Sequence, residues 1–265
     1  MGLTWSAHIS WLFGEVPYLQ RVEAAQRAGF QCIETAWPQH AADRDGLGAK
    51  LAEHGMCVAL LNCNEGDIAS GERGFLNDNA RRTELERDFL AAAELAERIG
   101  ARNLNLLVGR ALPDIPIARQ RWRILDALRE LAVEAQERGL RILLEPLNSL
   151  ENPNYLLATP QAAAELIERC DSDALGMLLD IYHVARAGAD PLVAIERYAE
   201  LIGHVQISDF PGRGQPGSGS LELWRMLETL EGSGYEGTVG LEYVPTGTEA
   251  EPMAFLSDAR SPVRL

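Results

Sequence analysis

Short apolar runs alternate with longer amphipathic stretches from one end of this chain to the other. The apolar runs predict buried strands, and the stretches between them carry the 3.6-residue period of helices. The predicted strands are Trp5–Ser10, Cys32–Thr35, Met56–Asn62, Asn103–Val108, Arg141–Glu145, Ala174–Asp180, His204–Ser208 and Thr238–Glu242. The predicted helices are Glu15–Ala28, Asp43–Glu53, Asn79–Ile99, Ile117–Arg138, Pro160–Arg169, Pro191–Leu201 and Leu221–Glu231. Such a repeat indicates parallel strands joined by helical crossovers.

Parallel strands with helical crossovers form either an open doubly wound sheet or a closed barrel. Eight such units in a chain of 265 residues favour the barrel, whose usual length is about 250 residues. No change in composition along the chain marks a linker between domains. We therefore expect a single-domain α/β protein in which residues 1–265 form one (β/α)₈ barrel.

Glycine and proline mark the predicted helix boundaries. A residue that is free to adopt a positive φ closes the last turn of a helix well, and glycine does this at no steric cost. Thr159–Pro160 and Asp190–Pro191 each supply an N-cap followed by proline at the first helical position. The glycines expected to end helices are Gly29, Gly55, Gly100, Gly139, Gly203 and Gly234.

The charge balance limits the partners of this chain. It carries 39 Asp and Glu against 24 Lys and Arg, a formal net charge of −15. This charge repels polyanions, so binding to nucleic acid or to anionic lipid is disfavoured. The first residues lack the basic start of an export signal, and no stretch reaches the roughly 18 apolar residues of a membrane span. We expect a cytoplasmic protein with a small-molecule partner, no nucleic acid and no membrane, and we leave open whether it forms a homo-oligomer.

The four cysteines, Cys32, Cys57, Cys63 and Cys170, are scattered and form no C-x-x-C pair. A chain of this size does not need disulfides to hold its core together. We therefore expect no disulfide, in keeping with a reducing compartment.

Acid or amide side chains end four of the predicted strands. Glu145, Asp180, Gln206 and Glu242 follow apolar runs at intervals of about one β–α unit. Because the carboxyl ends of parallel barrel strands meet on one face, these four side chains should converge. Carboxylates that meet in an apolar mouth repel one another unless a cation compensates their charge, and oxygen donors suit Mg²⁺ or Mn²⁺. The alternative is that each side chain separately caps the loop that follows it.

Four further residues are candidates for binding a substrate. His183 lies three residues after Asp180 and should lie in the loop over the same mouth, where it could bind either the metal or the substrate. Arg213 lies in a glycine-rich loop after the seventh predicted strand, where a guanidinium can bind a carboxylate through two hydrogen bonds. Glu72 and Arg73 belong to a loop of small residues after the third predicted strand, a composition typical of a mobile lid.

Several segments resemble the hydroxypyruvate isomerase group of the xylose isomerase-like TIM barrels. They are WLFGEVPYLQRVEAAQRAGF, SGERG, LLEPLN with NPNY, LLDIYH, HVQISDFPGRGQPGSG and VGLEYVP, and together they span nearly the whole chain. The resemblance implies a (β/α)₈ TIM barrel with a divalent cation. It also implies reversible conversion of hydroxypyruvate, or of a related 2-oxo sugar acid, into tartronate semialdehyde through an enediolate.

The same resemblance implies roles for individual residues. Glu145 and Glu242 become the catalytic proton-transfer pair, and His183 and Arg213 become substrate contacts. The metal ligands that it implies are Glu145, Asp180, Gln206 and Glu242. This chain departs from the usual pattern of the family at His8, Asn64 and Glu65, which would line the mouth and bear on the substrate.

Other functions fit the same scaffold. A ketose 3-epimerase or a sugar dehydratase would use the same enediolate, although an uncharged ketose has no carboxylate for Arg213. An abasic-site endonuclease would need a histidine-rich zinc cluster and a surface that accepts phosphates, against five histidines and a net charge of −15 in this chain. A non-catalytic sugar-binding barrel would have no use for the full set of carboxylates.

Overall fold

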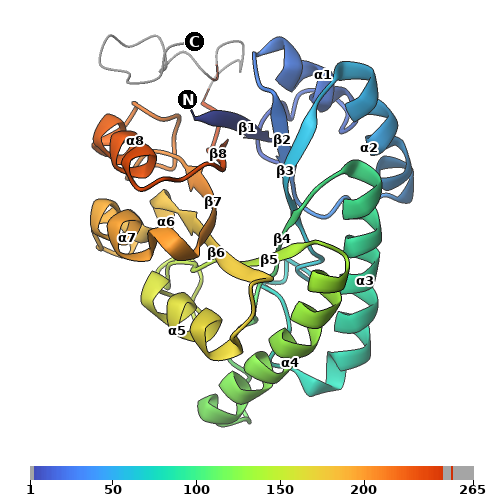
Figure 1. The fold of residues 1–265 in the computed structure, drawn as a ribbon, viewed down its shortest axis with the longest axis vertical. Helices are drawn as coiled ribbons and strands as arrows, with labels where there is room; N and C mark the ends of the chain where they lie inside the picture. Colours follow the sequence, from blue (N-terminus) through green and yellow to red (C-terminus); the bar gives the residue numbers. More distant parts are fainter. Residues whose placement is uncertain (1–2, 247–251, 253–265) are drawn as a thin grey trace.

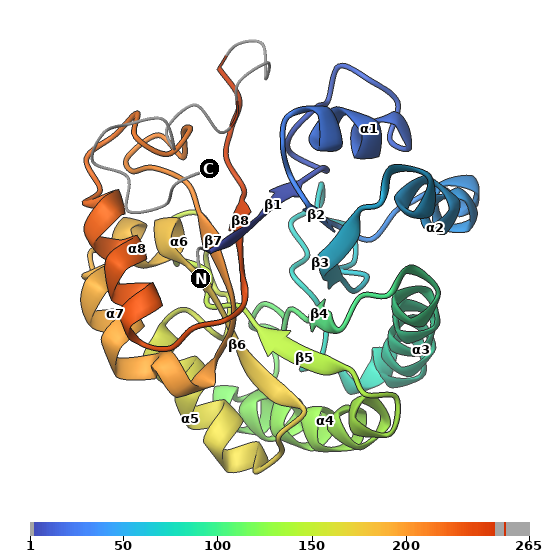
Figure 2. The same ribbon diagram turned by 45° about the horizontal axis from the view of Figure 1, so that its top comes forward.

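Eight parallel strands close into one barrel in the computed structural model, which describes residues 3–246 and residue 252. The strands follow one another around the barrel in chain order, and β1 pairs with β8 to close it. Helices surround the strands on the outside (Figure 1), and the second view in Figure 2 shows the same ring. The predicted single-domain (β/α)₈ barrel is confirmed, while residues 1 and 265, the limits of the predicted domain, lie outside the described residues.

All eight predicted strands and all seven predicted helices are present in the described part of the chain. The strands are β1 (Thr4–His8), β2 (Cys32–Thr35), β3 (Cys57–Asn62), β4 (Asn103–Asn105), β5 (Arg141–Leu144), β6 (Leu175–Asp180), β7 (Ile202–Ile207) and β8 (Thr238–Leu241). The helices are α1 (Gln20–Arg27), α2 (Ala41–His54), α3 (Arg82–Ile99), α4 (Ile117–Glu137), α5 (Pro160–Cys170), α6 (Ile181–Arg186), α7 (Pro191–Tyr198) and α8 (Leu223–Gly232). Single 3₁₀ turns, η1 (Asn79–Arg81) and η2 (Ala199–Leu201), adjoin α3 and α7.

Several boundaries differ from the sequence-based ones, and β4 ends at Asn105 rather than at Val108. Helix α1 begins later than predicted, at Gln20, after a series of turns. Gly203 does not end a helix, because the η2 turn ends earlier and Gly203 is already inside β7. The short helix α6 was not predicted, and it begins because the Asp180 carboxylate accepts hydrogen bonds from the N–H groups of Tyr182 and His183.

The remaining predicted helix ends are confirmed. The side chain of Thr159 accepts a hydrogen bond from the N–H of Ala162, and that of Asp190 accepts one from the N–H of Leu192. These contacts satisfy N–H groups that have no partner inside a first helical turn. The glycines that adopt a positive φ at predicted helix ends are Gly29, Gly55, Gly100, Gly139 and Gly234.

The interior of the barrel has an apolar side and a polar side. Alternate residues of a barrel strand point inward, so the residue two positions before each mouth residue lies deeper in the interior. Leu60, Leu143 and Leu178 form a fully buried cluster that is separate from the main core. On β2 and β7, Glu34 and His204 are equally buried but polar, and they form an ion pair at 2.8 Å.

Glu34 is the centre of this polar side. Its Oε1 accepts a hydrogen bond from the Ser6 hydroxyl at 2.5 Å, and its Oε2 accepts one from Gln206 Nε2 at 2.8 Å. Burial opposes ionisation, but His204 and the hydrogen bonds outweigh it and hold the pKa of Glu34 at about 2. Gly240 leaves room for this carboxylate, because a Cβ there would lie 1.7 Å from Glu34 Oε1.

The expectation of no disulfide is wrong. Cys32 and Cys57 begin β2 and β3 as register partners, and they form a disulfide with their Cα atoms 4.4 Å apart. Cys63 and Cys170 are free and buried. The pairing depends on the register of two neighbouring strands, which the spacing of cysteines in the sequence does not contain.

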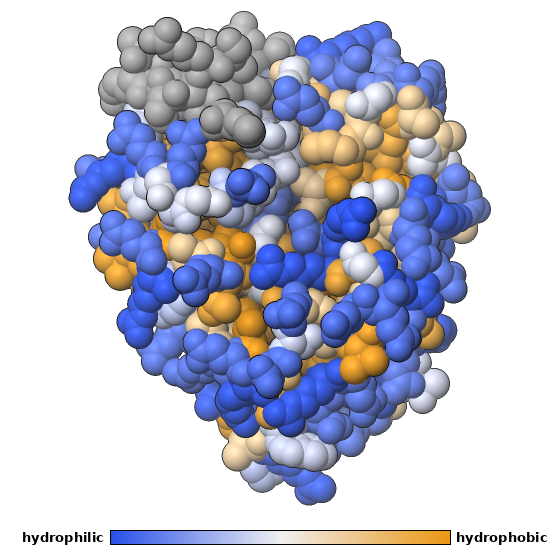
Figure 3. All heavy atoms as spheres, viewed as in Figure 1, coloured by the Kyte–Doolittle hydropathy of each residue, from blue (hydrophilic) through white to orange (hydrophobic). Residues whose placement is uncertain are grey.

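The face of the molecule drawn in Figure 3 is largely polar. Hydrophilic side chains dominate the face drawn in Figure 3, with apolar side chains among them. Among the described residues, no helix combines the length and the apolar character needed to cross a lipid bilayer.

Gly240→Ala should destabilise the protein because the new methyl group would overlap the Glu34 carboxylate. Overpacking an interior costs about 1–3 kcal/mol, which corresponds to a fall in Tm of roughly 2–12 °C in a domain of this size. Gly232→Ala is the matched control, since a Cβ at that position at the end of α8 has no atom within 4 Å. Thermal unfolding followed by circular dichroism makes the comparison, and equal Tm values for the two variants would show that Glu34 does not need this space.

Candidate active site at the barrel mouth

The carboxyl ends of the strands bring the predicted acids to one mouth. Glu145 follows β5, Asp180 ends β6, Gln206 lies in β7 as the register partner of Asp180, and Glu242 follows β8. All four are more than nine-tenths buried. Arg213 Nη2 lies 3.1 Å from Asp180 Oδ2 and 2.7 Å from Glu242 Oε2, so these two acids point at the same place.

Glu145, Asp180 and His183 form a buried triad that could hold a metal ion. One ligand atom from each lies within 4.8 Å of the others. His183 Nε2 is 3.6 Å from Asp180 Oδ2 and 3.9 Å from Glu145 Oε1. His183 lies in the first turn of α6 rather than in an irregular loop, because Asp180 Oδ1 caps that helix and Oδ2 remains directed at the mouth.

Gln206 adds a buried oxygen that has no partner. Its Nε2 donates to Glu34, which fixes the orientation of the amide. Its Oε1 is buried and has no hydrogen-bond partner within residues 3–246. An unpartnered buried oxygen is costly, and one that lies beside carboxylates is the type of ligand that hard divalent cations prefer. The donor set at the mouth therefore fits such a cation.

His183 is held as a hydrogen-bond donor toward the acids. Its Nδ1 accepts the backbone N–H of Asn148 at 3.3 Å and lies 2.7 Å from the side-chain Nδ2 of the same residue. Glu151 orients that amide, since it donates its N–H to Asn148 Oδ1 and accepts from Nδ2. Burial lowers the pKa of His183, so the ring is neutral and carries its one proton on Nε2.

Glu145 and Glu242 are buried among like charges. Burial raises the pKa of Glu145 well above its ordinary value, and the charges of Glu242 and Asp180 raise it further. A 2.7 Å hydrogen bond from Asn105 Nδ2 acts in the opposite direction and lowers this pKa. Burial also raises the pKa of Glu242 to about 8, against the attraction of Arg213. A carboxyl group whose pKa is raised toward neutrality, as that of Glu242 is, can both take and return a proton.

Arg213 reaches across the mouth from the loop between β7 and α8. Its guanidinium carbon lies 4.5 Å from the centre of the Trp11 ring and 5.2 Å from that of Tyr182. Two of the acids accept from its Nη2, while its Nε is buried and has no acceptor among the described residues. One N–H group of Arg213 is thus free to bind a substrate.

Glu72 and Arg73, the two predicted residues of the loop after β3, have different partners in the structure. Glu72 Oε1 pairs with Arg81 at 2.5 Å and ties the loop to η1, so this side chain serves the loop itself. Arg73 Nε donates to Asn152 Oδ1 at 2.8 Å, which bridges to the loop after β5. The charge of Arg73 lies within electrostatic range of Glu145. The sequence did not distinguish these adjacent charges, because the path of the loop decides where each one points.

Two asparagines at the mouth were missed by the sequence analysis. Asn62 ends β3 and Asn105 ends β4, and they are register partners. Both are nine-tenths or more buried, and the Oδ1 of each has no hydrogen-bond partner in the described part of the chain. A polar residue at the end of an apolar run was the signal that found the four later strand ends. It applies to Asn62, whereas Asn105 is followed by three apolar residues in the sequence and gives no such signal.

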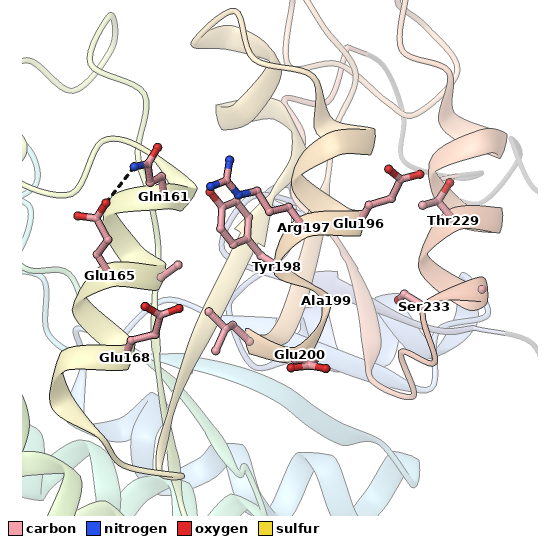
Figure 4. A pocket seen from close by; sticks show the side chains of 13 residues that line it. Gln161, Glu165, Glu168, Glu196, Arg197, Tyr198, Ala199, Glu200, Thr229 and Ser233 are labelled. Carbon is pink, nitrogen blue, oxygen red and sulfur yellow. Dashed lines mark hydrogen bonds between the residues drawn. The ribbon is translucent and has the colours of Figure 1, made fainter.

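A groove of about 1020 Å³ lies on the outside of the barrel, between α5, α7 and the end of α8 (Figure 4). Gln161 donates to Glu165 at one side of it. No strand end reaches this groove, so the side chains that converge at the mouth are absent from its lining. Its acidic lining residues are Glu165, Glu168, Glu196 and Glu200.

Comparison with known proteins places the chain in a family. Residues 22–259 match the xylose isomerase-like TIM barrel family. This chain belongs to that family. The hydroxypyruvate isomerase of Escherichia coli strain K12 is 33% identical to it, over 94% of this chain and 96% of the relative. The 2-oxo-tetronate isomerase of Cupriavidus necator is 32% identical, over 92% of this chain and 94% of the relative.

A solved structure from Brucella melitensis has the same fold. It is described as an AP endonuclease of family 2, is 29% identical and has a TM-score of 0.92, over 98% of this chain and 100% of its own. Within the xylose isomerase-like barrels, the curated relatives place this chain in the group of hydroxypyruvate and 2-oxo-tetronate isomerases. The resemblance stated from the sequence is confirmed.

We call the triad of Glu145, Asp180 and His183 the metal-site candidate. Asp180→Asn should weaken the binding of Mn²⁺ at least about tenfold, because it removes a charge from this site but keeps an oxygen that can cap α6. At 100 times the dissociation constant a bound ion stabilises a protein by about 2.7 kcal/mol, so the wild type should show a clear rise in Tm with Mn²⁺. Asp190→Asn, at the N-cap of α7, is the matched control. Isothermal titration of the metal-free proteins gives the affinities. Equal Mn²⁺ affinity in the two variants would remove Asp180 from the site.

Proposed function

We propose that this protein is a divalent-cation-dependent isomerase that interconverts hydroxypyruvate, or a related 2-oxo sugar acid, with tartronate semialdehyde or the corresponding 3-oxo product. The observation that carries the proposal is the pair of buried carboxyl groups with raised pKa values, Glu145 and Glu242, beside a donor set that fits a cation. The relatives named for hydroxypyruvate and 2-oxo-tetronate support the substrate class.

Glu145, Asp180, Gln206 and Glu242 would hold the cation, Mg²⁺ or Mn²⁺, through oxygen atoms. When bound, the cation would polarise the substrate carbonyl and offset the negative charge that develops beside it. His183 stays outside this ligand set, because its Nδ1 accepts from Asn148 and its Nε2 carries the proton. Its Nε2–H would instead donate to a substrate oxygen.

The two glutamates would move the proton. A carboxylate oxygen of Glu145 or Glu242 takes the proton from the hydroxyl-bearing carbon next to the carbonyl, which leaves an enediolate. The same carboxyl group or the facing one then returns a proton to the former carbonyl carbon, and the hydroxyl proton passes from one substrate oxygen to the other. General-base catalysis of this kind contributes roughly 10²–10⁴ in rate.

Arg213 and Arg73 are the proposed contacts of the acid group. Arg213 has a buried Nε–H without an acceptor, and Arg73 lies within electrostatic range of Glu145. Direct contact of Glu72 with the substrate stays a prediction, since in the structure this side chain binds Arg81 and holds the loop that carries Arg73.

An endonuclease activity is not proposed for this chain, although the Brucella melitensis structure is described as an AP endonuclease. The net charge of −15 opposes binding to a polyanion. Among the described residues, the metal-site candidate contains one histidine and two carboxylates, which is not a histidine-rich zinc cluster.

Glu145→Gln and Glu242→Gln should each lower turnover at least about 10²-fold, because glutamine keeps the size and an oxygen but cannot transfer the proton. The measurements are kcat on hydroxypyruvate and deuterium incorporation from D₂O, followed by NMR. Glu168→Gln, in the outer groove, is the control and should retain full turnover. Near-normal turnover and deuterium incorporation in both Glu145→Gln and Glu242→Gln would reject the two-carboxylate mechanism.

Gln206→Met and His183→Phe should separate cation binding from substrate binding. Gln206→Met loses the unpartnered oxygen and should weaken Mn²⁺ binding at least about tenfold. His183→Phe should leave Mn²⁺ affinity within about threefold and lower kcat/KM at least about tenfold, since it removes a donor to the substrate. Calorimetry and steady-state kinetics measure the two effects. The reverse pattern would make His183, and not Gln206, the ligand that completes the site.

A further inference from the structure

Polar groups without partners also lie at the ends of β1 and β3, strands that supply none of the proposed cation ligands. His8 ends β1 and is 1% exposed, yet neither of its ring nitrogens has a hydrogen-bond partner among the described residues. Asn62 ends β3, is 8% exposed, and its Oδ1 is likewise unpartnered there. A buried polar group left without a partner costs about 1–3 kcal/mol, so a ligand that satisfies several of them gains affinity.

Glu65 completes this group of side chains. Asn62 Nδ2 donates to Glu65 Oε1 at 2.6 Å, which holds the carboxyl group in place and directs Asn62 Oδ1 elsewhere. Burial raises the pKa of Glu65 to about 7. The charge of Glu242 raises this pKa as well, whereas the hydrogen bond from Asn62 and the charge of His8 lower it. We call His8, Asn62 and Glu65 the β1–β3 cluster.

The β1–β3 cluster adjoins the reacting groups. His8 Nε2 lies 3.7 Å from Glu242 Oε1, which we propose as a proton-transfer group. On the other side, Asn62 is the register partner of Asn105, whose Nδ2 donates to Glu145. A substrate that reaches both glutamates therefore has the β1–β3 cluster within the same mouth.

The chemistry of the β1–β3 cluster suits a hydroxyl group. Asn62 Oδ1 and the Glu65 carboxyl oxygens accept hydrogen bonds, and His8 adds two buried ring nitrogens that have no partner among the described residues. A substrate carboxylate has only acceptor oxygens, so it could not donate a hydrogen bond to Asn62 Oδ1. A hydroxyl both donates and accepts, and it carries no charge.

We propose, on the basis of the proposed function, that the β1–β3 cluster binds a hydroxyl group on a substrate carbon beyond the two reacting carbons. A three-carbon acid has no such hydroxyl, because its carboxylate, its carbonyl and its single hydroxyl-bearing carbon are all used in the reaction. The preferred substrate is therefore a 2-oxo acid of four or more carbons that carries a hydroxylated tail. His8 and Glu65 are its specificity-determining residues.

The kinetic test compares hydroxypyruvate with 3,4-dihydroxy-2-oxobutanoate on the Mn²⁺-loaded protein. The wild type should have a kcat/KM at least about tenfold higher for the four-carbon acid, because a site built to bind a hydroxyl discriminates against an analogue that lacks it. Glu65→Leu and His8→Phe should each lower the four-carbon to three-carbon ratio at least about tenfold. Glu168→Leu, in the outer groove, is the matched control and should keep the wild-type ratio.

A binding test covers variants that turn over too slowly to assay. Calorimetric titration with threonate and with glycerate compares a four-carbon and a three-carbon hydroxy acid that lack the reactive carbonyl. The wild type should bind threonate at least about tenfold more tightly, and Glu65→Leu should lose this difference. Glu65→Gln keeps an acceptor and the size of the side chain, so it should retain part of the difference and serves if Glu65→Leu does not fold.

Equal or better use of the three-carbon acids by the wild type, in kinetics and in binding, would overturn the proposal. An unchanged four-carbon preference in folded Glu65→Leu and His8→Phe would overturn it as well. Failure of the proposed function would look different, since then neither 2-oxo acid would be turned over. The threonate and glycerate affinities would still decide whether the β1–β3 cluster binds a hydroxylated tail.

Discussion

The parallel register of a closed barrel forces the side chains at the carboxyl ends of its strands into one mouth. In this protein the constraint gathers Glu145, Asp180 and Glu242 in a buried space, where burial and the neighbouring charges disfavour ionisation of Glu145 and Glu242. Arg213 offsets part of this charge by binding Asp180 and Glu242 at once. The need to compensate the remaining charge links the metal-site candidate, the raised pKa values and the position of Arg213 into one arrangement.

The polar side of the barrel interior supports this mouth from below. Glu34 is held ionised by His204, and it binds the amide of Gln206 so that the opposite oxygen remains available. Gly240 makes the room that the Glu34 carboxylate needs. The cluster of Leu60, Leu143 and Leu178 on the other side has no polar side-chain atoms that need partners, and it fills the interior by packing alone.

In the proposed function, the mouth has a reacting side and a recognition side. Strands β5 to β8 supply the carboxyl groups and the amide that we assign to cation binding and proton transfer. Strands β1 and β3 and the loop after β3 supply neutral or weakly acidic groups that do not belong to this set. In a barrel each strand end lies on its own β–α unit, so the recognition side can change without disturbing the chemistry. His8 and Glu65, which end β1 and follow β3, belong to the proposed recognition side.

Local patterns in the sequence contained the strand and helix order, the helix caps at Thr159 and Asp190, and the acids at the ends of the later strands. These features depend on the period of apolar residues and on the chemistry of neighbouring residues, which the linear order preserves. The convergence of the strand ends followed from the barrel itself. The same signal would have found Asn62, but not Asn105, because three apolar residues follow Asn105 and only the structure ends β4 there.

Only the tertiary structure decided which distant side chains meet. The pairs Cys32–Cys57 and Glu34–Gln206, and the contact of Asn148 with His183, join residues on different strands and loops. Whether Glu72 or Arg73 faces the mouth depends in the same way on the path of a loop. Contacts of this kind are set by strand register, barrel closure and loop path, and a one-residue change of register would reverse which side chains face inward. A local sequence pattern reports the inward face of a strand, but not the partner that the closed barrel places opposite it.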